Sequence, residues 1–161
     1  MIPQRNLIID LANFTCVLVD PTFCKELTCV VHKRRPEPVI SVRFMLTETE
    51  PKFNMHFYVD LIKSDNTIIK LGNSQLNGCQ YLNLMYTNNM YGKYYKRIKQ
   101  HSNLPKKCPI SGNKLFEIRN YTVKADEYPP AVPELTHRMT LKIQRNDRVV
   151  AIICFIASTI Y

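Results

Sequence analysis

Apolar and polar residues alternate along much of this 161-residue chain, and this two-residue period constrains the fold more than any other feature of the sequence. The clearest run covers residues 53–61, where every second position is apolar: Phe53, Met55, Phe57, Val59 and Leu61. Residues 40–46 and 139–143 alternate in the same way. Each run is typical of a β-strand with one face turned towards a core.

Further strands are predicted at residues 13–19, 27–33, 67–71, 115–125 and 149–157. The last is apolar at nearly every position, as is typical of a strand in the middle of a packed sheet. The strand at 115–125 changes phase, which predicts a β-bulge near Arg119 and Asn120. About eight strands without a repeat or a linker predict an all-β, antiparallel two-sheet sandwich. We assign it to a single domain of residues 13–161, after an N-terminal extension of residues 1–12.

Residues 80–101 depart from the strand pattern. Their apolar and aromatic residues recur at helical spacing: Leu84, Tyr91, Tyr94, Tyr95 and Ile98. Gly92 weakens the middle of this segment, so the predicted helix covers either all of it or only the part after Asn88. The prolines and the glycine of residues 101–113 then end the helical excursion.

Six cysteines are spread over the chain: Cys16, Cys24, Cys29, Cys79, Cys108 and Cys154. No pair has Cys-x-x-Cys spacing and no histidine lies at a zinc-ligand interval, so we predict a disulfide framework and no metal site. The sequence leaves the pairing open. One arrangement has the bonds Cys24–Cys29, Cys79–Cys108 and Cys16–Cys154; a second pairs Cys16 with Cys29 and Cys24 with Cys154.

The cysteines also bear on the compartment, because disulfides form and persist in oxidising surroundings. Residues 1–10 do not resemble a signal peptide, so the chain is either cytosolic or a mature product whose signal has been removed. Two glycosylation sequons, at Asn13 and Asn120, agree with the second alternative. We therefore expect a secreted, extracellular glycoprotein.

The net charge of +9 comes from scattered basic residues, with clusters at residues 32–35 and 93–101. No nucleic-acid-binding motif accompanies this charge, so we expect no nucleic-acid partner. Contact with anionic lipid head groups or with a receptor is compatible with the basic clusters. The motifs G-x-S-x-G and H-E-x-x-H and the P-loop are absent, so we predict no catalytic residues, no cofactor and no enzymatic activity.

The chain resembles a large insect family of small secreted proteins, most clearly in its C-terminal half. The resemblance lies in a Ser-Asn pair, a Cys-Pro before a glycine-bearing turn and a Pro-Pro-x-x-Pro-Glu break: Ser102, Asn103, Cys108, Pro109, Gly112, Pro129, Pro130, Pro133 and Glu134. Residues 76–82 (LNGCQYL) resemble the family's Cys-x-aromatic-Leu element, although Asn77 stands where an acidic residue is usual. This family is grouped with the ML (myeloid-differentiation-related lipid-recognition) superfamily. Its relatives include the ganglioside activator, the Niemann–Pick type C cholesterol carrier and chemosensory proteins of the CheB type.

The resemblance implies an immunoglobulin-like, ML-like sandwich whose sheets splay apart at one end to hold a lipid or another small hydrophobic ligand, in chemosensory or lipid-transport roles. The candidate lipid-binding residues are the inward positions of the strands and two tyrosines of the helical segment: Phe44, Leu46, Phe53, Met55, Phe57, Val59, Leu61, Tyr91, Tyr95, Met139, Leu141 and Ile143. The alternative is a secreted protein–protein interaction module, in which the same inward residues form a closed core and the tyrosines supply the interaction surface.

Overall fold

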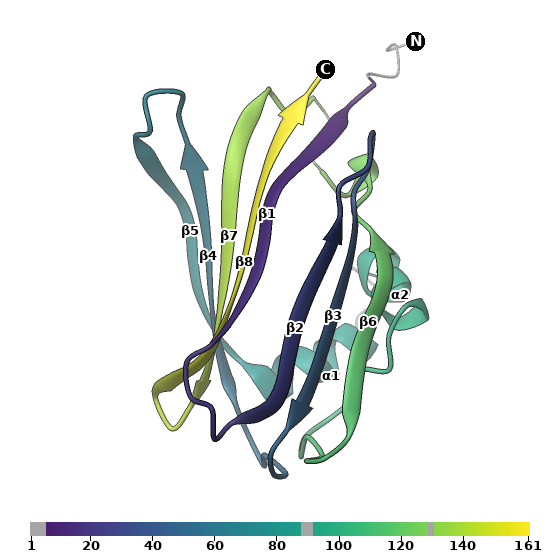
Figure 1. Ribbon diagram of the computed structural model, residues 1–161, viewed down its shortest axis with the longest axis vertical. Coiled ribbons are helices and arrows are strands. Elements are labelled where there is room, and N and C mark those ends of the chain that lie inside the picture. Colours follow the sequence, from purple (N-terminus) through teal and green to yellow (C-terminus); the bar gives the residue numbers. More distant parts are fainter. Residues whose placement is uncertain (1–5, 88–91, 129–130) are drawn as a thin grey trace.

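Two antiparallel β-sheets face each other, and two short helices lie at one open side of the sandwich (Figure 1). The computed structural model describes residues 6–87, 92–128 and 131–161, without the side chains of positions 85–95. Within these residues, strand pairing confirms the predicted all-β, immunoglobulin-like, antiparallel two-sheet sandwich.

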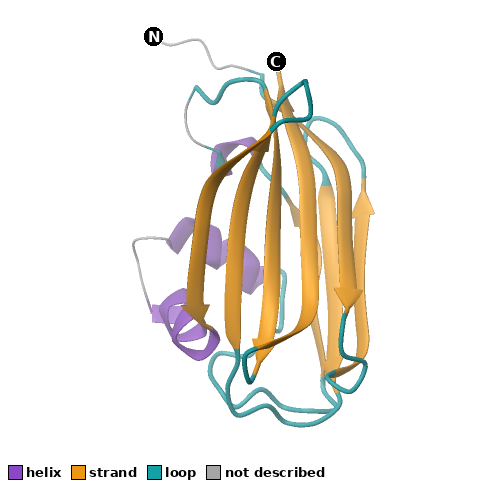
Figure 2. Cartoon of the chain, turned by 90° about the vertical axis from the view of Figure 1, so that its left-hand side faces the viewer, coloured by secondary structure: helices purple, strands orange, loops and turns teal. Residues whose placement is uncertain are grey.

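The larger sheet has five strands and the smaller has three. In spatial order, the larger sheet contains β1 (Ile8–Leu18), β8 (Arg148–Ile160), β7 (Leu135–Arg145), β4 (Asn54–Ile62) and β5 (Ile68–Asn77). The smaller sheet contains β2 (Cys24–His32), β3 (Val39–Leu46) and β6 (Leu115–Thr122). Between β5 and β6 the chain forms α1 (Gly78–Thr87) and α2 (Gly92–Gln100), on one side of the sandwich (Figure 2). α1 contacts β5 and β4 of the larger sheet, whereas α2 contacts β6 of the smaller sheet. A short 3₁₀ helix (Ala125–Glu127) follows β6.

Two element boundaries differ from those predicted from the sequence. β1 begins at Ile8, so residues 8–11 of the expected N-terminal extension pair with β8. Ile9 and Leu11 in this segment are buried in the core. The helical excursion consists of two helices, and α2 begins at Gly92, the residue expected to weaken a single helix. Residues 88–91 between the helices lie outside the described residues.

The predicted bulge in β6 is confirmed. Arg119 and Asn120 together oppose the single residue Ser41 of β3. The Asn120 N–H donates a hydrogen bond to Ser41 Oγ at 2.9 Å, and the side chain of Asn120 is exposed. Asn13 in β1 is exposed as well, so both sequon asparagines are accessible, and their glycosylation stays a prediction.

The inward faces of the sheets pack differently at the two ends of the sandwich. At the end that holds the chain termini, buried apolar side chains form a closed cluster between the sheets: Ile9, Leu11, Phe14, Val42, Tyr121, Val123, Phe155 and Ala157. The rings of Phe14 and Phe155 meet edge to face there, with centroids 6.3 Å apart. A second cluster lies at the opposite end: Phe23, Cys24, Leu46, Leu82, Ile110, Phe116 and Val150.

One disulfide lies at each open side of the sandwich. Cys16 in β1 is bonded to Cys29 in β2, and these strands are edges of different sheets. On the other side, Cys79 in the first turn of α1 is bonded to Cys108 in the loop before β6. In both bonds the Cα atoms are 5.5 Å apart. Covalent links therefore restrain the spacing of the sheets on both sides.

The expectation that all six cysteines are paired is wrong, because Cys24 and Cys154 are free. Of the bonds considered from the sequence, Cys16–Cys29 and Cys79–Cys108 are present, and those involving Cys24 or Cys154 are not. The strand register gives the reason. Cys154 lies between Thr15 and Thr140 on the outer face of the larger sheet, whereas its neighbour Ile153 faces inward. A cysteine on the outer face cannot reach an inward-facing partner without moving the backbone.

Replacing Cys16 and Cys29 together by alanine is expected to lower the free energy of unfolding by about 3 kcal/mol. The bond closes a loop with a sequence separation of 13 residues, and its loss increases the conformational entropy of the unfolded chain. Urea unfolding followed by circular dichroism measures the change. Cys154→Ala is the control, with an expected loss below about 1 kcal/mol; equal losses in both variants would show that the bond does not stabilise the sandwich.

Candidate functional site

A cavity of about 240 Å³ lies between the two sheets, at the end of the sandwich away from the chain termini. Apolar cavities of about 150 Å³ can hold a benzene-sized molecule, so this one has room for roughly ten carbon atoms. Its walls are almost entirely apolar: Phe23, Cys24, Leu27, Val42, Phe44, Leu46, Glu50, Phe53, Met55, Tyr81, Leu82, Leu104, Pro105, Ile110, Ile118, Leu141, Ile143, Ala151 and Ile153.

Alternate side chains of the strands point inward and form the apolar walls of the cavity. Successive inward positions of β3 supply Val42, Phe44 and Leu46, and those of β7 supply Leu141 and Ile143 on the opposite sheet. The ring of Phe44 stacks on that of Phe116 in β6, with centroids 5.2 Å apart. This stacking orients the Phe44 ring, which forms part of the cavity wall.

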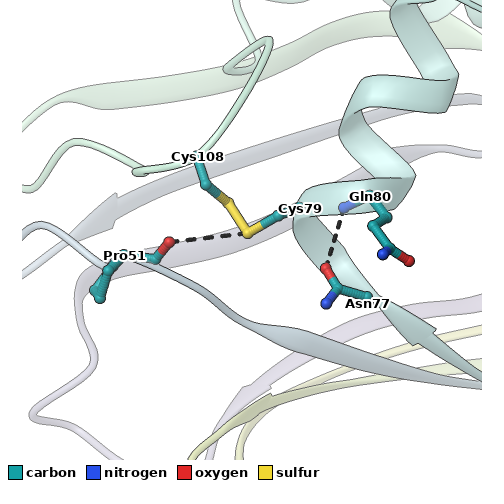
Figure 3. The surroundings of a disulfide bond; sticks show 5 residues. All are labelled: Pro51, Asn77, Cys79, Gln80 and Cys108. Atoms are coloured by element: carbon teal, nitrogen blue, oxygen red, sulfur yellow. Dashed lines mark hydrogen bonds between the residues drawn. A yellow bond between two sulfur atoms is a disulfide. The ribbon is translucent and has the colours of Figure 1, made fainter.

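The first turn of α1 is fixed from three directions (Figure 3). The Asn77 side-chain oxygen accepts the N–H of Gln80 at 3.1 Å, which is an N-cap interaction. Cys79, in the same turn, is held by its disulfide to Cys108, and its Sγ lies 3.9 Å from the carbonyl oxygen of Pro51. An aspartate would cap the helix in the same way, so Asn77 keeps this role at the position where the resemblance led us to expect an acid. With α1 fixed, Tyr81 and Leu82 form one side of the cavity.

Gly78 allows the closest approach in this wall. Its N–H donates to the Phe53 carbonyl oxygen at 2.9 Å, and a Cβ on Gly78 would lie 2.3 Å from the Phe53 ring. No other residue type fits at position 78 unless this ring moves. Because Phe53 itself lines the cavity, the glycine lets the ring sit directly beneath the start of α1.

The loop of residues 101–114 supplies the last part of the wall, through Leu104, Pro105 and Ile110. Asn103 joins this loop to β6, since its amide group donates to the Leu115 carbonyl at 2.9 Å and accepts the Glu117 N–H at 2.7 Å. The loop is also pressed against residues 48–49, because a Cβ on Gly112 would lie 2.4 Å from the Glu48 backbone. Asn103 and Gly112 of the resemblance motif therefore hold the loop in position.

One charged residue, Glu50, stands among the apolar residues around the cavity, and its side chain is 7% exposed. Arg145, at the end of β7, donates from Nη1 to Glu50 Oε1 at 2.8 Å and from Nη2 to Asp20 Oδ2 at 3.2 Å. Its guanidinium group also lies over the ring of Phe23, 5.5 Å from the centroid. The hydrogen bond to Glu50 is the main reason that the pKa of Arg145 is raised.

The free thiol of Cys24 lies near Glu50. Burial and, to a smaller extent, the negative charge of Glu50 together raise the pKa of Cys24 to about 11. The group is therefore protonated at neutral pH and acts as a small apolar part of the wall.

The candidate lipid-binding residues fall into three groups. The cavity is lined by Phe44, Leu46, Phe53, Met55, Leu141 and Ile143. It is not lined by Phe57, Val59, Leu61 or Met139, which lie farther along the same strands; Met139 packs against the closed cluster. Tyr91 lies outside the described residues, and the side chain of Tyr95 in α2 is not described.

Several residues that line the cavity are not among the candidates predicted from the sequence. Strand alternation could have identified Val42 and Ile118. Val42 lies two residues before the candidate Phe44 on β3, and Ile118 lies two residues after the inward-facing Phe116 on β6. Tyr81 and Leu82 belong to the LNGCQYL element, whose packing direction the sequence does not define. Glu50 carried no signal, since a carboxylate between two strands usually lies in solvent.

The surface that the cavity offers to a ligand is apolar. No helix among the described residues is long and apolar enough to cross a bilayer. Within the same residues, no cluster of three or more His, Cys, Asp or Glu side chains is arranged to hold a metal ion.

Comparison with known proteins gives a family match and several structural neighbours. The model of the family described as “Protein of unknown function (DUF1091)” matches residues 53–139, from the start of β4 into β7. The chain matches none of the curated proteins with which it was compared. A crystal structure of a Niemann-Pick type C2 protein from Japanese carpenter ant is similar over 94% of this chain and 92% of that chain, with 12% sequence identity and a TM-score of 0.37.

The two free thiols should differ in reactivity. At about pH 7, N-ethylmaleimide is expected to label Cys154 in the folded protein and Cys24 only after unfolding, because Cys24 is buried and its pKa is about 11. Intact-mass measurement with peptide mapping locates the label, and Cys154→Ser provides the control without folded-state labelling. A protein that takes up no label even after unfolding would contain three disulfides and would contradict the pairing described above.

Proposed function

We propose that this chain, which belongs to the DUF1091 family, is a non-enzymatic carrier that binds a small hydrophobic molecule, such as a single-chain lipid, between its two sheets. The observation that supports this proposal is the cavity itself, which is about 240 Å³ in volume and lined by apolar side chains from both sheets. An apolar cavity without a ligand leaves its wall atoms without packing partners, and a hydrophobic guest restores those contacts.

The size of the cavity sets the expected affinity. Burying about ten carbons yields roughly 8 kcal/mol at about 0.8 kcal/mol per methylene, before the cost of immobilising the ligand. A dissociation constant in the micromolar range or weaker is therefore expected, and the protein needs no further contacts to reach it.

The alternative function, a protein–protein interaction module, requires a closed core at this end of the sandwich. The cavity favours the carrier, because Tyr81 and Leu82 of α1 line a hollow that a closed core would fill. In this arrangement α1 forms a roof over the ligand, and truncating or moving it would open the cavity to water.

We also propose that the protein is secreted and that it is a member of the ML superfamily. The two disulfides support an oxidising compartment outside the cytosol. The motif residues Asn103, Cys108 and Gly112, on which the resemblance to insect secreted and chemosensory proteins rests, hold one wall of the cavity in place. We further propose contact with a membrane surface or a receptor when the ligand is delivered.

Filling the cavity tests the carrier function directly. Ala151 in β8 is 3% exposed and lines the cavity, so Ala151→Phe is expected to occupy the space that a ligand needs. The variant should bind 1-decanol at least about tenfold more weakly than the native protein, as measured by isothermal titration calorimetry. Its melting temperature should stay the same or rise, because the ring removes a void.

The matched control is Ile152→Phe, one residue along β8, where the side chain points away from the cavity. Its affinity for 1-decanol is expected to equal that of the native protein. Native mass spectrometry of protein purified from a eukaryotic secretion host should also show a co-purified small lipid. Failure of the native protein to bind 1-decanol, or equal binding by Ala151→Phe, would reject the carrier function.

A further inference from the structure

One layer of side chains closes the cavity at the end nearer the chain termini. Val42 and Ile118 are paired on adjacent strands of the smaller sheet, and Ile153 lies on β8 of the larger sheet. All three residues line the cavity, and all three also belong to the closed cluster or pack against it. They stand at the boundary between the open and the closed part of the interior and form the floor of the cavity.

The Cys16–Cys29 disulfide joins the two sheets at the level of this floor. In the strand register Cys16 is paired with Ile153, and Cys29 is paired with Val42. Because directly paired residues have their side chains on the same face, the bond crosses the gap between the sheets beside the floor. β1 and β2 cannot separate at this level while the bond is intact, so the floor cannot open to let a longer ligand through.

The interior behind the floor is filled. One pair of residues farther towards the termini, Met139 is paired with Phe155 on the larger sheet. At the corresponding position on the smaller sheet, Ile40 is paired with Tyr121. Phe155 and Tyr121 are buried in the closed cluster, and the other two residues pack against it. A ligand chain that passed the floor would have to displace these close-packed side chains.

The polar end of a ligand has to stay at the other end of the cavity. The surface of the cavity is apolar, and burying a hydroxyl group without a hydrogen-bond partner is costly. Leu104 and Pro105 line the cavity and are partly exposed, and Leu104 packs against the cluster at the end away from the termini. That end borders on solvent, so a ligand lies with its methyl end against the floor.

We propose that the floor sets the chain length of the ligand: single-chain amphiphiles gain affinity up to about ten carbons, and further methylenes gain none. Val42, Ile118 and Ile153 are the residues that determine this specificity. The inference rests on the proposed carrier function and adds which members of a ligand series the cavity holds in full.

A series of 1-alkanols from six to fourteen carbons measures the limit. Protein is titrated calorimetrically into each alkanol below its solubility limit. The dissociation constant is expected to fall about fourfold per methylene up to about ten carbons. Beyond this length it should stay level, because the added methylenes remain in water. A dissociation constant that keeps falling through fourteen carbons would overturn the limit.

Ile153→Ala deepens the cavity at its floor by removing most of the side chain. The break in the series is expected to move to chains about two carbons longer. Ile143→Ala is the matched control, because Ile143 lines the cavity but packs against the cluster at the opposite end. Its break is expected to stay at about ten carbons. An equal displacement in both variants would mean that total volume sets the limit, and the role of the floor would be wrong.

The outcomes separate this inference from the carrier function. Binding of no alkanol rejects the carrier, whereas a break that Ile153→Ala does not move overturns the inference and leaves the carrier intact. Where Ile153→Ala fails to fold, as judged by circular dichroism, Ile153→Phe gives the opposite test, because the larger ring extends from the floor into the cavity. It is expected to shorten the break to about eight carbons; an unchanged break would contradict the inference.

Discussion

The restraint on sheet separation is the feature on which the rest of the structure depends. Two facing sheets normally approach until their side chains interdigitate and exclude space. Here Cys16–Cys29 joins one pair of edge strands, and Cys79–Cys108 fixes α1 against the loop before β6 on the other side. The closed cluster around Phe14 and Phe155 sets the spacing at one end, and α1 occupies part of the gap at the other. A cavity remains because neither sheet is free to close it.

The buried ion pair of Glu50 and Arg145 lies beside the cavity that this spacing leaves. A carboxylate at position 50 is tolerated in an apolar wall because Arg145 reaches it from the end of β7, and Phe23 shields the guanidinium group. Replacing such a pair by apolar residues is often neutral or stabilising in other proteins, so burial of this one is poorly explained by stability alone.

Much of the fold could be predicted because strand alternation is a local property. The alternation of residues 53–61 predicts which side chains face inward without information on the partner strands. In the same way, the phase change in residues 115–125 predicted the bulge at Arg119 and Asn120. The site was less accessible. Phe57 and Phe44 have equivalent patterns, yet Phe44 lines the cavity and Phe57 does not, because the difference lies in what packs opposite each of them.

The sequence by itself determined the sandwich, the helical excursion and which residues face inward, since these follow from periodicity and turn chemistry within a few residues. Tertiary structure alone decided three things: which cysteines are bonded, where along the strands the interior stays open, and that Glu50 is buried beside it. Cys154 shows the physical reason. It stands in a run that is apolar on both faces, so only pairing with Thr15 and Thr140 reveals that it points outward. Distances between segments far apart in the chain depend on register and on packing across the sheets, and no local pattern records them.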